Sequence, residues 1–300
     1  MRRRLLALVV AATLAAPPAG ALALPAMWTV HGSHATAVLF GSVHLLPTGV
    51  QWEPPALAEA LAHADEIWFE LPIDAATGAR AQALVIEKGA QPKGVSLFDD
   101  LNAKDAERLR RACDEVGVPP QVLAPMRPWL AEVTLSLAQD ARAGAKPSEG
   151  VEQQLSQQVG AKVKRRAFET PEQQINFLAA APRAEQNASL RETLTEVADD
   201  PGLYDRAVKA WLSGDLASLR KDSLQSLIKA SPAMYRRLIV DRNRRWAAVL
   251  DQRLKEDGEI VVVVGAGHLL GPDGLPALLR VRGYAIDGPP DGAPSARIDH

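Results

Sequence analysis

The sequence predicts an α/β fold, because strand-like segments lie near both ends of the chain and helix-forming residues fill the middle. The strongest strand signal is residues 260–264, an isoleucine followed by four valines, which is typical of a strand buried on both faces. Residues 74–256 are instead rich in Ala, Leu, Glu, Gln and Arg, which favour helices. With 300 residues, 47% apolar and 23% charged, the chain has a globular composition and can bury a sizeable core.

The segment after the first 23 residues predicts a hairpin, a helix and a third strand. Two strands, residues 28–30 and 36–40, are expected to flank a short turn. A helix is expected over residues 54–64, where apolar side chains recur on one face after a proline. The apolar residues 67–69 then predict a short strand that ends at Glu70.

One strand interrupts the helical middle of the chain. It is expected over residues 162–168, and Glu169 follows it directly. Thr170 then has the position and the following proline expected of a helix cap. The last helix is expected near residues 276–281, and the polar, Pro- and Gly-rich residues 289–300 are expected to form a loose tail.

The beginning of the sequence predicts a secretory signal peptide, which we place at residues 1–23. Three arginines at positions 2–4 precede an apolar stretch over residues 5–16, and Ala-Leu-Ala at residues 21–23 is typical of a cleavage site. The apolar stretch is too short to span a bilayer and lacks the polar face of a retained amphipathic anchor. We therefore expect a periplasmic or secreted protein with no stable membrane span in the mature chain.

Charge and cysteine content exclude some partners and one source of stability. Subtracting the three leader arginines from the 34 basic residues leaves 31 against 36 acidic ones, so the formal charge moves from -2 to -5. This balance argues against a nucleic-acid partner, which requires a clustered positive face. Cys113 is the single cysteine, so no disulfide can form within the chain. The core, or in part a bound ion, must therefore provide stability.

A Gly-x-x-His motif occurs twice, each time directly after an apolar strand. The first motif ends at His44 and the second at His268. Glu70 and Glu169 occupy the equivalent place after their own strands. In sheets flanked by helices, ligands bind beyond the carboxyl ends of the strands. If these four strands are neighbours, two imidazoles and two carboxylates converge at one edge of the sheet.

Two neutral imidazoles and one carboxylate, with an open position for water, are typical of a divalent metal site, and Zn, Mn or Co are the candidate ions. Such an ion activates water, so hydrolysis is the expected reaction class. The second carboxylate would serve as a general base or would hold an imidazole by its other nitrogen. The alternative is that each histidine is an ordinary hydrogen-bonded turn residue.

Arg242 lies on the apolar face of a helix expected over residues 232–254, in a row with Leu238, Trp246 and Leu250. A guanidinium that faces a core needs a carboxylate or an anionic transition state beside it. The alternative is an aliphatic stem along the surface with the charged group in water.

Other patterns add no second chemistry. The sequence has no Gly-x-x-x-x-Gly-Lys-Ser/Thr, no Gly-x-Ser-x-Gly and no His-Glu-x-x-His, so a phosphate-binding loop, a serine-hydrolase elbow and a zincin helix are unsupported. Five tryptophans are expected to pack in the core or at its rim rather than to bind carbohydrate. They are Trp52, Trp68, Trp129, Trp211 and Trp246.

These motifs resemble the TraB/GumN family, which is related to the Tiki metalloproteases and more distantly to erythromycin-esterase and ChaN-like proteins. The resemblance covers nearly the whole chain after the signal peptide and rests on the order and spacing of eight segments. They lie at residues 25–28, 39–47, 68–70, 126–129, 168–173, 241–246, 264–269 and 278–284.

The resemblance implies a fold and a set of site residues. The fold would be one domain over residues 24–288, with a central mixed sheet built from residues 24–73 and 257–288 and a large, mostly helical insertion over residues 74–256. His44, Glu70 and His268 match the positions proposed to bind metal in the Tiki branch. Glu169 and Arg242 also match family positions.

Two departures from the family pattern affect the site. Ser42 replaces the commoner threonine and keeps the hydroxyl. Gly-Val-Glu at residues 150–152 stands where the family usually has Gly-Ile-Asp, so the added methylene leaves the role of Glu152 open.

The leading hypothesis is an exported, metal-dependent hydrolase of the Tiki-like type with a peptide or small-molecule substrate. His44 and His268 would hold the ion, and Glu70 would complete the ligand set or activate water. Arg242 would stabilise an oxyanion or anchor Glu70 or Glu169. Two alternatives stay open: a metal-independent esterase with His44 as base, and a non-enzymatic protein that binds a peptide or polysaccharide in the export compartment.

Overall fold

The structure is a computed structural model that describes residues 24–290 and confirms the α/β class. The predicted signal peptide, residues 1–23, and residues 291–300 of the predicted tail lie outside the described residues. Pro289, at the start of that tail, is bound to the sheet, because Trp28 Nε1 donates a hydrogen bond of 3.0 Å to its carbonyl. Between residues 24 and 290, no helix combines the length and the apolar content needed to cross a membrane.

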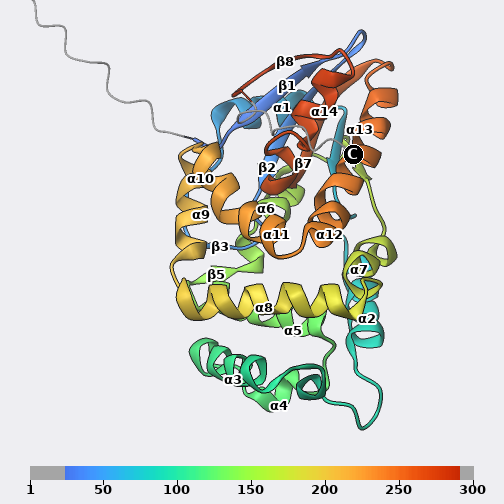
Figure 1. Ribbon diagram of the computed structural model, residues 1–300. Helices are drawn as coiled ribbons and strands as arrows, with labels where there is room; N and C mark the ends of the chain where they lie inside the picture. The colour runs from blue at the N-terminus through green and yellow to red at the C-terminus, as the bar shows by residue number, and fades with distance from the viewer. Residues whose placement is uncertain (1–23, 291–300) are drawn as a thin grey trace, which may run out of the picture.

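A six-stranded mixed sheet, built from both ends of the chain and one strand of the middle, forms the centre of the fold (Figure 1). Its strands are β1 (Met27–His31), β2 (Ala35–Ser42), β4 (Glu66–Phe69), β6 (Lys164–Ala167), β7 (Gly258–Gly265) and β8 (Ala285–Asp287). Their spatial order is β6-β4-β7-β2-β1-β8. The first four of these run parallel, and β1 is antiparallel to both β2 and β8. A separate two-stranded sheet pairs β3 (Leu46–Pro47) with β5 (Ala145–Lys146).

The strands expected from the sequence are present, and β7 is buried on both faces as predicted. Ile260, Val262 and Val264 pack into one core cluster, while Val261 and Val263 pack into another on the opposite face. Because successive side chains of a strand point to opposite faces, a run without polar interruption is what a central, doubly covered strand requires.

Helices from both ends and from the middle cover the two faces of the sheet. The terminal helices are α1 (Pro55–His63) and α14 (Leu275–Val281). The α-helices between them are α2 (Ala75–Gly89), α3 (Ala103–Val116), α4 (Pro120–Leu123), α5 (Pro128–Arg142), α6 (Val151–Gln158), α7 (Pro171–Ala179), α8 (Arg183–Asp199), α9 (Leu203–Leu212), α10 (Leu216–Arg220), α11 (Ser226–Ala230), α12 (Pro232–Tyr235) and α13 (Asp241–Arg253). The cap predicted for α7 is a complete capping box between Thr170 and Gln173.

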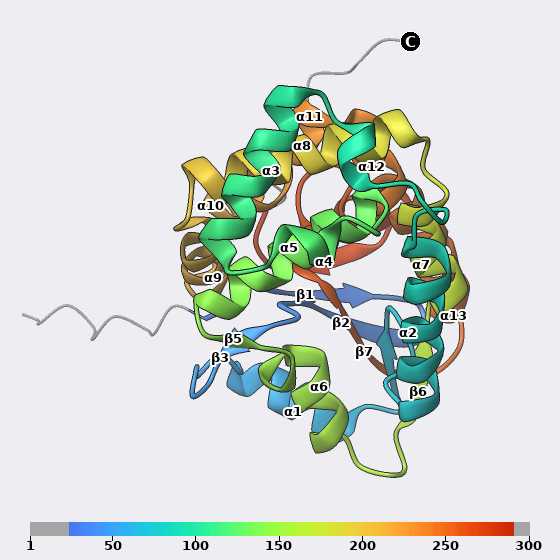
Figure 2. The same ribbon diagram turned by 90° about the horizontal axis from the view of Figure 1, so that it is seen from below.

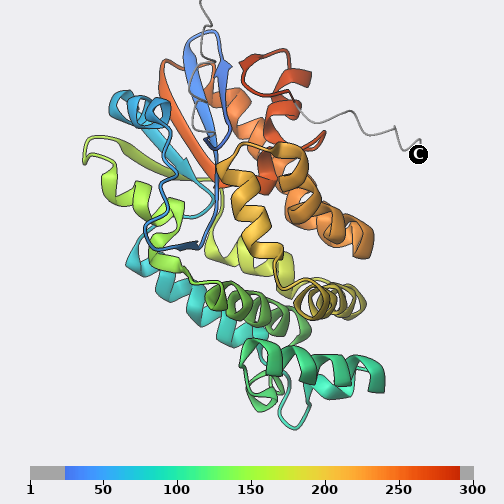
Figure 3. The ribbon, with the colours of Figure 1, turned by 90° about the vertical axis from the view of Figure 1, so that its left-hand side faces the viewer.

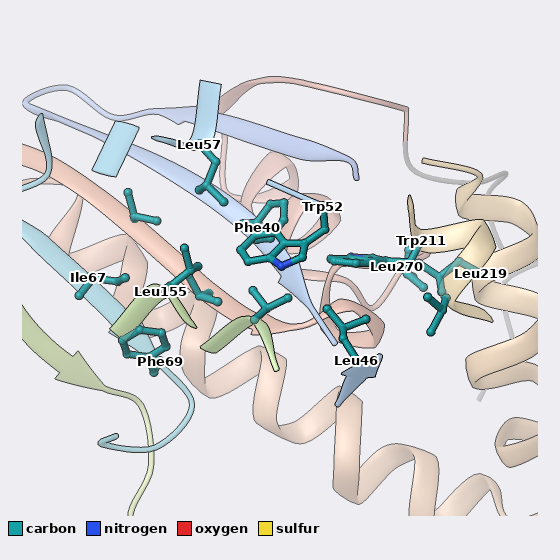
Figure 4. Packing of buried hydrophobic residues seen from close by; sticks show 14 of the residues in the cluster. Phe40, Leu46, Trp52, Leu57, Ile67, Phe69, Leu155, Trp211, Leu219 and Leu270 are labelled. Carbon is teal, nitrogen blue, oxygen red and sulfur yellow. The ribbon is translucent and has the colours of Figure 1, made fainter. Parts of the chain in front are cut away.

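Tryptophans anchor the core on each face, as the sequence predicts. On the face covered by α1, α6 and α9, the ring of Phe40 lies 5.8 Å from that of Trp52 and 6.3 Å from that of Trp211 (Figure 4). On the other face, Trp246 of α13 packs with α14. Trp129 is also buried, and Trp68 stacks on Phe168 at 5.1 Å.

A third cluster of buried residues lies within the helical middle, away from the sheet. It joins α3, α5 and α8 through residues such as Leu109, Leu135 and Leu190. Figures 1 and 3 show these helices below the sheet, and Figure 2 shows α3, α5 and α8 from underneath. The insertion therefore has a small core of its own.

Three features were not expected from the sequence. The strand β8 has three residues, too few to show an alternating pattern. The helix predicted over residues 232–254 is interrupted by a π-helical turn, η4 (Arg236–Val240), and a second π turn, η3 (Lys221–Gln225), lies between α10 and α11. The spacing of apolar residues does not reveal a π turn, which is frequent at functional sites. Short 3₁₀ turns complete the chain: η1 (Leu97–Asp100), η2 (Pro147–Glu149) and η5 (Ala266–Leu269).

Candidate active site

The four strands that precede the predicted site residues are neighbours. Because β6, β4, β7 and β2 are adjacent and parallel, their carboxyl ends meet at one edge of the sheet. Glu169, Glu70, His268 and His44 follow these strands in that order across the sheet. The expectation that the four strand ends adjoin is therefore correct.

Gly265, at the end of β7, lies between the three residues predicted to hold a metal. A Cβ atom on Gly265 would be 3.2 Å from Glu70 Oε1, 3.6 Å from His44 Nε2 and 3.7 Å from His268 Cδ2. The space that a larger residue would fill is thus shared by both imidazoles and the carboxylate. Glycine at this position keeps it open.

Arg242, on α13, is the centre of a buried ion cluster. Its Nη2 donates to Glu70 Oε2 at 2.5 Å and to Glu169 Oε2 at 2.8 Å, and its Nε donates to Glu169 Oε1 at 2.9 Å. Only 6% of Arg242 is exposed. The expectation that a guanidinium on this apolar face needs carboxylates is confirmed, and the surface alternative is wrong.

The pKa of Glu70 lies below its ordinary value of 4.5. Burial alone would raise it, but nearby positive charge and the Gly265 N–H, which donates to Oε1 at 2.8 Å, lower it. A protonated His268 would contribute most to this effect. We attribute the lowering instead to Arg242, because its Nη1 donates to His268 Nε2 at 3.0 Å, which requires that nitrogen to carry no proton.

Glu169 has the opposite pKa shift, although it binds the same guanidinium. Burial raises its pKa and the negative charge of Glu70 raises it further, while the hydrogen bonds from Arg242 oppose both effects. Trp246 Nε1 also donates to Glu169 Oε1 at 3.1 Å. Arg242 therefore binds both carboxylates, and Arg245, whose Nη2 lies 3.8 Å from Glu169 Oε1, adds a second positive charge beside Glu169.

His268 is buried and neutral. Burial lowers its pKa to about 3. Its Nδ1 lies 2.6 Å from Asn243 Oδ1, so Nδ1 carries the proton and Nε2 accepts the bond from Arg242. The ring also lies 4.4 Å from that of Trp246. These contacts fix both the orientation and the tautomer of the imidazole.

His44 is held in a similar way but is open to solvent. Its Nδ1 lies 2.6 Å from Glu152 Oε1, which also accepts a 2.6 Å hydrogen bond from Ser42 Oγ. The negative charge of Glu152 raises the pKa of His44 from 6.5 to about 9. Since 62% of the His44 side chain is exposed, water screens part of this attraction. The glutamate at position 152, one methylene longer than the aspartate of the family pattern, therefore reaches His44 and orients its ring.

A cavity of about 320 Å³ lies over this edge of the sheet. His44, Glu70 and Glu152 line it, together with Gln153, Gln174 and the apolar residues Phe69, Leu71, Ile73 and Pro147. Gln174 Nε2 donates to Glu70 Oε2 at 3.2 Å. His268, Arg242 and Glu169 are buried and do not line the cavity. Of the predicted site residues, His44 and Glu70 are thus the ones that face it.

The donor atoms of these side chains are of the types that bind a divalent ion, but they do not surround one common point in this structure. Both histidines are anchored through Nδ1 by a second side chain, as metal-binding histidines usually are. Glu70 Oε1 and His268 Nε2 are 3.8 Å apart, within the roughly 3 to 5 Å expected of two ligands that share an ion. Among residues 24–290, no three His, Cys, Asp or Glu side chains already surround one point as a ligand set.

Sequence reasoning missed two residues that hold the site. Asn243 orients His268, and Gln174 bonds to Glu70. Asn243 is fully buried in the first turn of α13, which continues directly from α12 and η4, so it lies inside a longer helical stretch where asparagine is an unfavourable residue. An asparagine inside a predicted helix was therefore the one feature of the sequence that could have pointed to this position.

Comparison with known proteins places the chain among relatives that share most of its length. It is 26% identical to the uncharacterised protein YbaP of Escherichia coli (strain K12) over 245 residues, which cover 81% of this chain and 87% of the relative. An uncharacterised protein of Treponema pallidum (strain Nichols) is 25% identical over 203 residues, or 64% of this chain and 60% of that protein. No solved structure matches the chain. The sequence model of the TraB/PrgY/gumN family matches residues 26–287, and the chain therefore belongs to that family.

Proposed function

We propose that this protein is an exported, metal-dependent hydrolase that cleaves peptide bonds. The observation that carries the proposal is the convergence of His44, Glu70 and His268 around Gly265 at the carboxyl ends of parallel strands. The signal peptide predicted at residues 1–23 supports export, and the ion would be Zn, Mn or Co.

Three atoms would hold the ion: His44 Nε2, Glu70 Oε1 and His268 Nε2. A divalent ion supplies Lewis acidity, which polarises a carbonyl and lowers the pKa of water. His268 Nε2 is occupied by Arg242 Nη1, so ion binding requires Arg242 to give up this one bond. Arg242 keeps its bonds to Glu70 Oε2 and Glu169, so both carboxylates stay in place.

The other site residues would position groups rather than exchange protons. Glu70, whose pKa is held below its ordinary value of 4.5, is too weak a base to remove a proton from water near neutral pH, so we assign it to the ligand set. Arg242 anchors Glu70 and Glu169, and Glu152 orients His44. The apolar wall of the cavity, with Gln153 beside it, suits a peptide side chain and its backbone amide.

The charge state of His44 argues against the metal-independent esterase. A histidine with a pKa of about 9 is protonated at neutral pH and cannot accept a proton from water. In the metal-dependent reaction the ion would replace the Nε2 proton, while Nδ1 keeps its contact with Glu152.

Metal loading of the purified chain lacking residues 1–23 tests the proposal. After removal of metal with a chelator and reloading with Zn, Mn or Co, mass spectrometry should find about one ion per chain. His44→Ala and His268→Ala should lose the ion and also lose cleavage of a peptide library. His63→Ala is the matched control, because His63 is exposed on α1 and bonds only to a backbone carbonyl. A chain that retains no ion, with peptide cleavage unaffected by either site variant, would refute it.

A further inference from the structure

The helical middle of the chain contains a second cavity, which is separate from the candidate active site. It has a volume of about 310 Å³ and is lined by residues of α5, α8, α9, η3 and α11. These helices lie together below the sheet in Figure 1. None of the residues that line it also lines the cavity at His44.

Two polar helix faces oppose each other across this cavity, where packed helices normally present apolar residues. Glu132, Ser136 and Gln139 are four and three residues apart on α5, and therefore share one face. The facing side of α8 carries Ser189, Glu192, Thr193 and Glu196 at the same spacing. Most of these side chains are half-buried, so the two faces enclose a polar hollow rather than part of the core.

The charge of the lining is entirely negative. Five carboxyl side chains line the cavity, and its lining contains no Lys, Arg or His: the carboxyl groups belong to Glu132, Asp140, Glu192, Glu196 and Asp222. Arg206, outside the lining, lies 3.8 Å from Asp222. Ser189 and Ser226 donate to one oxygen each of Glu132 and Glu196. Within residues 24–290, Glu132 and Asp140 have no ion-pair partner.

Two lining atoms are buried without a hydrogen-bond partner, and they differ in kind. Glu132 Oε2 is an unpaired acceptor, and Gln139 Nε2 is an unpaired donor. Leaving such groups unpaired costs about 1 to 3 kcal/mol each, so native proteins rarely do so without a ligand or water. The two residues are seven positions apart on α5, which corresponds to about 10 Å along the helix. A matching ligand is therefore elongated, with a donor at one end and an acceptor at the other.

The pKa values of the carboxyl groups agree with a missing positive partner. Burial raises the pKa of Glu132 to about 7 and that of Asp140 to about 6. Burial also raises the pKa of Glu196. A cation beside these groups would favour their ionised forms, so its binding would release protons from the protein near neutral pH.

We propose that this cavity binds a small, elongated organic cation whose ammonium group donates to Glu132 Oε2 and whose carbonyl accepts from Gln139 Nε2. The volume leaves room for about ten non-hydrogen atoms, at roughly 30 Å³ each. A cation that also carries a carbonyl fits better than a bare metal ion, because Gln139 Nε2 is an unpaired donor and a metal ion cannot accept its hydrogen bond.

Calorimetric titration of the chain lacking residues 1–23 with 6-aminohexanamide tests this site without any hydrolysis assay. The compound carries an ammonium group and an amide carbonyl at opposite ends. It should saturate one site, whereas hexanamide, which lacks the charge, should bind at least tenfold more weakly. Titration at pH 7 in two buffers of different ionisation enthalpy should show proton release.

Two variants and one control separate binding from folding. Glu132→Gln keeps the shape of the side chain and should weaken binding about tenfold and reduce proton release, with Asp140 and Glu196 as the remaining sources. Gln139→Leu should weaken binding of 6-aminohexanamide but not of hexylammonium, which has no carbonyl. Asp199→Asn, at an exposed residue of the facing helix α8, should change neither the binding nor the proton release.

Thermal unfolding shows whether each variant is folded. The proposal fails if 6-aminohexanamide does not saturate the protein, in which case the cavity holds water only. It also fails if folded Glu132→Gln binds as tightly as the unaltered chain.

Discussion

Two buried carboxylates, Glu70 at the sheet edge and Glu132 in the helical layer, have pKa values that lie on opposite sides of the ordinary value. Burial raises the pKa of both. Glu70 has the Arg242 guanidinium and a backbone N–H beside it, and its pKa falls below 4.5. Glu132 has one serine hydroxyl and no cation, and its pKa rises to about 7. The partner supplied by the fold, rather than the depth of burial, therefore decides the charge of a buried acid in this protein.

Removing the partner should produce the largest effect. Arg242→Met keeps a long side chain but removes the guanidinium from buried Glu70 and leaves Glu169 with Arg245 at 3.8 Å. We expect a loss of about 3 to 5 kcal/mol in the free energy of unfolding near pH 7, measured by urea denaturation. Arg245→Met is the matched control, because Arg245 is half exposed and lies 3.8 Å from Glu169; it should cost less than about 1 kcal/mol. A loss for Arg242→Met no larger than for Arg245→Met would break the comparison.

Removing the charge of Glu132, which has no cation beside it, should raise the free energy of unfolding instead of lowering it. The pKa of Glu132 rises from 4.5 to about 7 on folding, so the folded chain binds a proton more tightly than the unfolded chain. Stability is therefore lost as the pH rises from 4.5 through 7. Glu132→Gln removes this loss and should stabilise the protein at pH 8 by roughly 2 to 3 kcal/mol, with no gain below pH 4.5. Urea denaturation at both pH values checks this, and a loss of stability at pH 8 would contradict it.

A smaller effect is expected at the exposed histidine of the candidate site. The ring of His44 should titrate near pH 9 by NMR and should return toward 6.5 in Glu152→Gln, because Glu152 is the main cause of the shift. Since the folded pKa is the higher one, the stability from this pair is present below pH 6.5 and is lost as the pH rises through 9. Glu149→Gln, on the preceding turn, serves as control. An unchanged titration in Glu152→Gln would show that the pair does not form in solution.

The sequence predicted the strand-end residues of the site better than the residues that support them. Glu70 and Glu169 directly follow apolar strands, so their place at the sheet edge is a local property of the chain. That β4, β7 and β2 are neighbours depended on the family resemblance, because no local pattern encodes strand order. Glu152 and Asn243 lie on helices whose position is set by tertiary packing, and no spacing rule links them to His44 or His268. The cavity at Glu132 escaped notice for the same reason, since its two polar helix faces belong to separate helices.

The π turn η4 determines what the loss of one residue would do at this point of the chain. Leu238, in this turn, offers its carbonyl to Arg242 Nη1 at 3.2 Å, so the wide turn itself takes part in holding the guanidinium. A π turn carries one more residue than an α turn. Deleting one residue here would restore ordinary α geometry, in which the Leu238 carbonyl accepts the backbone N–H of residue 242. The helices on either side would keep their register, because the extra residue is what widens the turn. A loss of length in this turn would therefore act first on the hold of the guanidinium and would leave the helix itself intact.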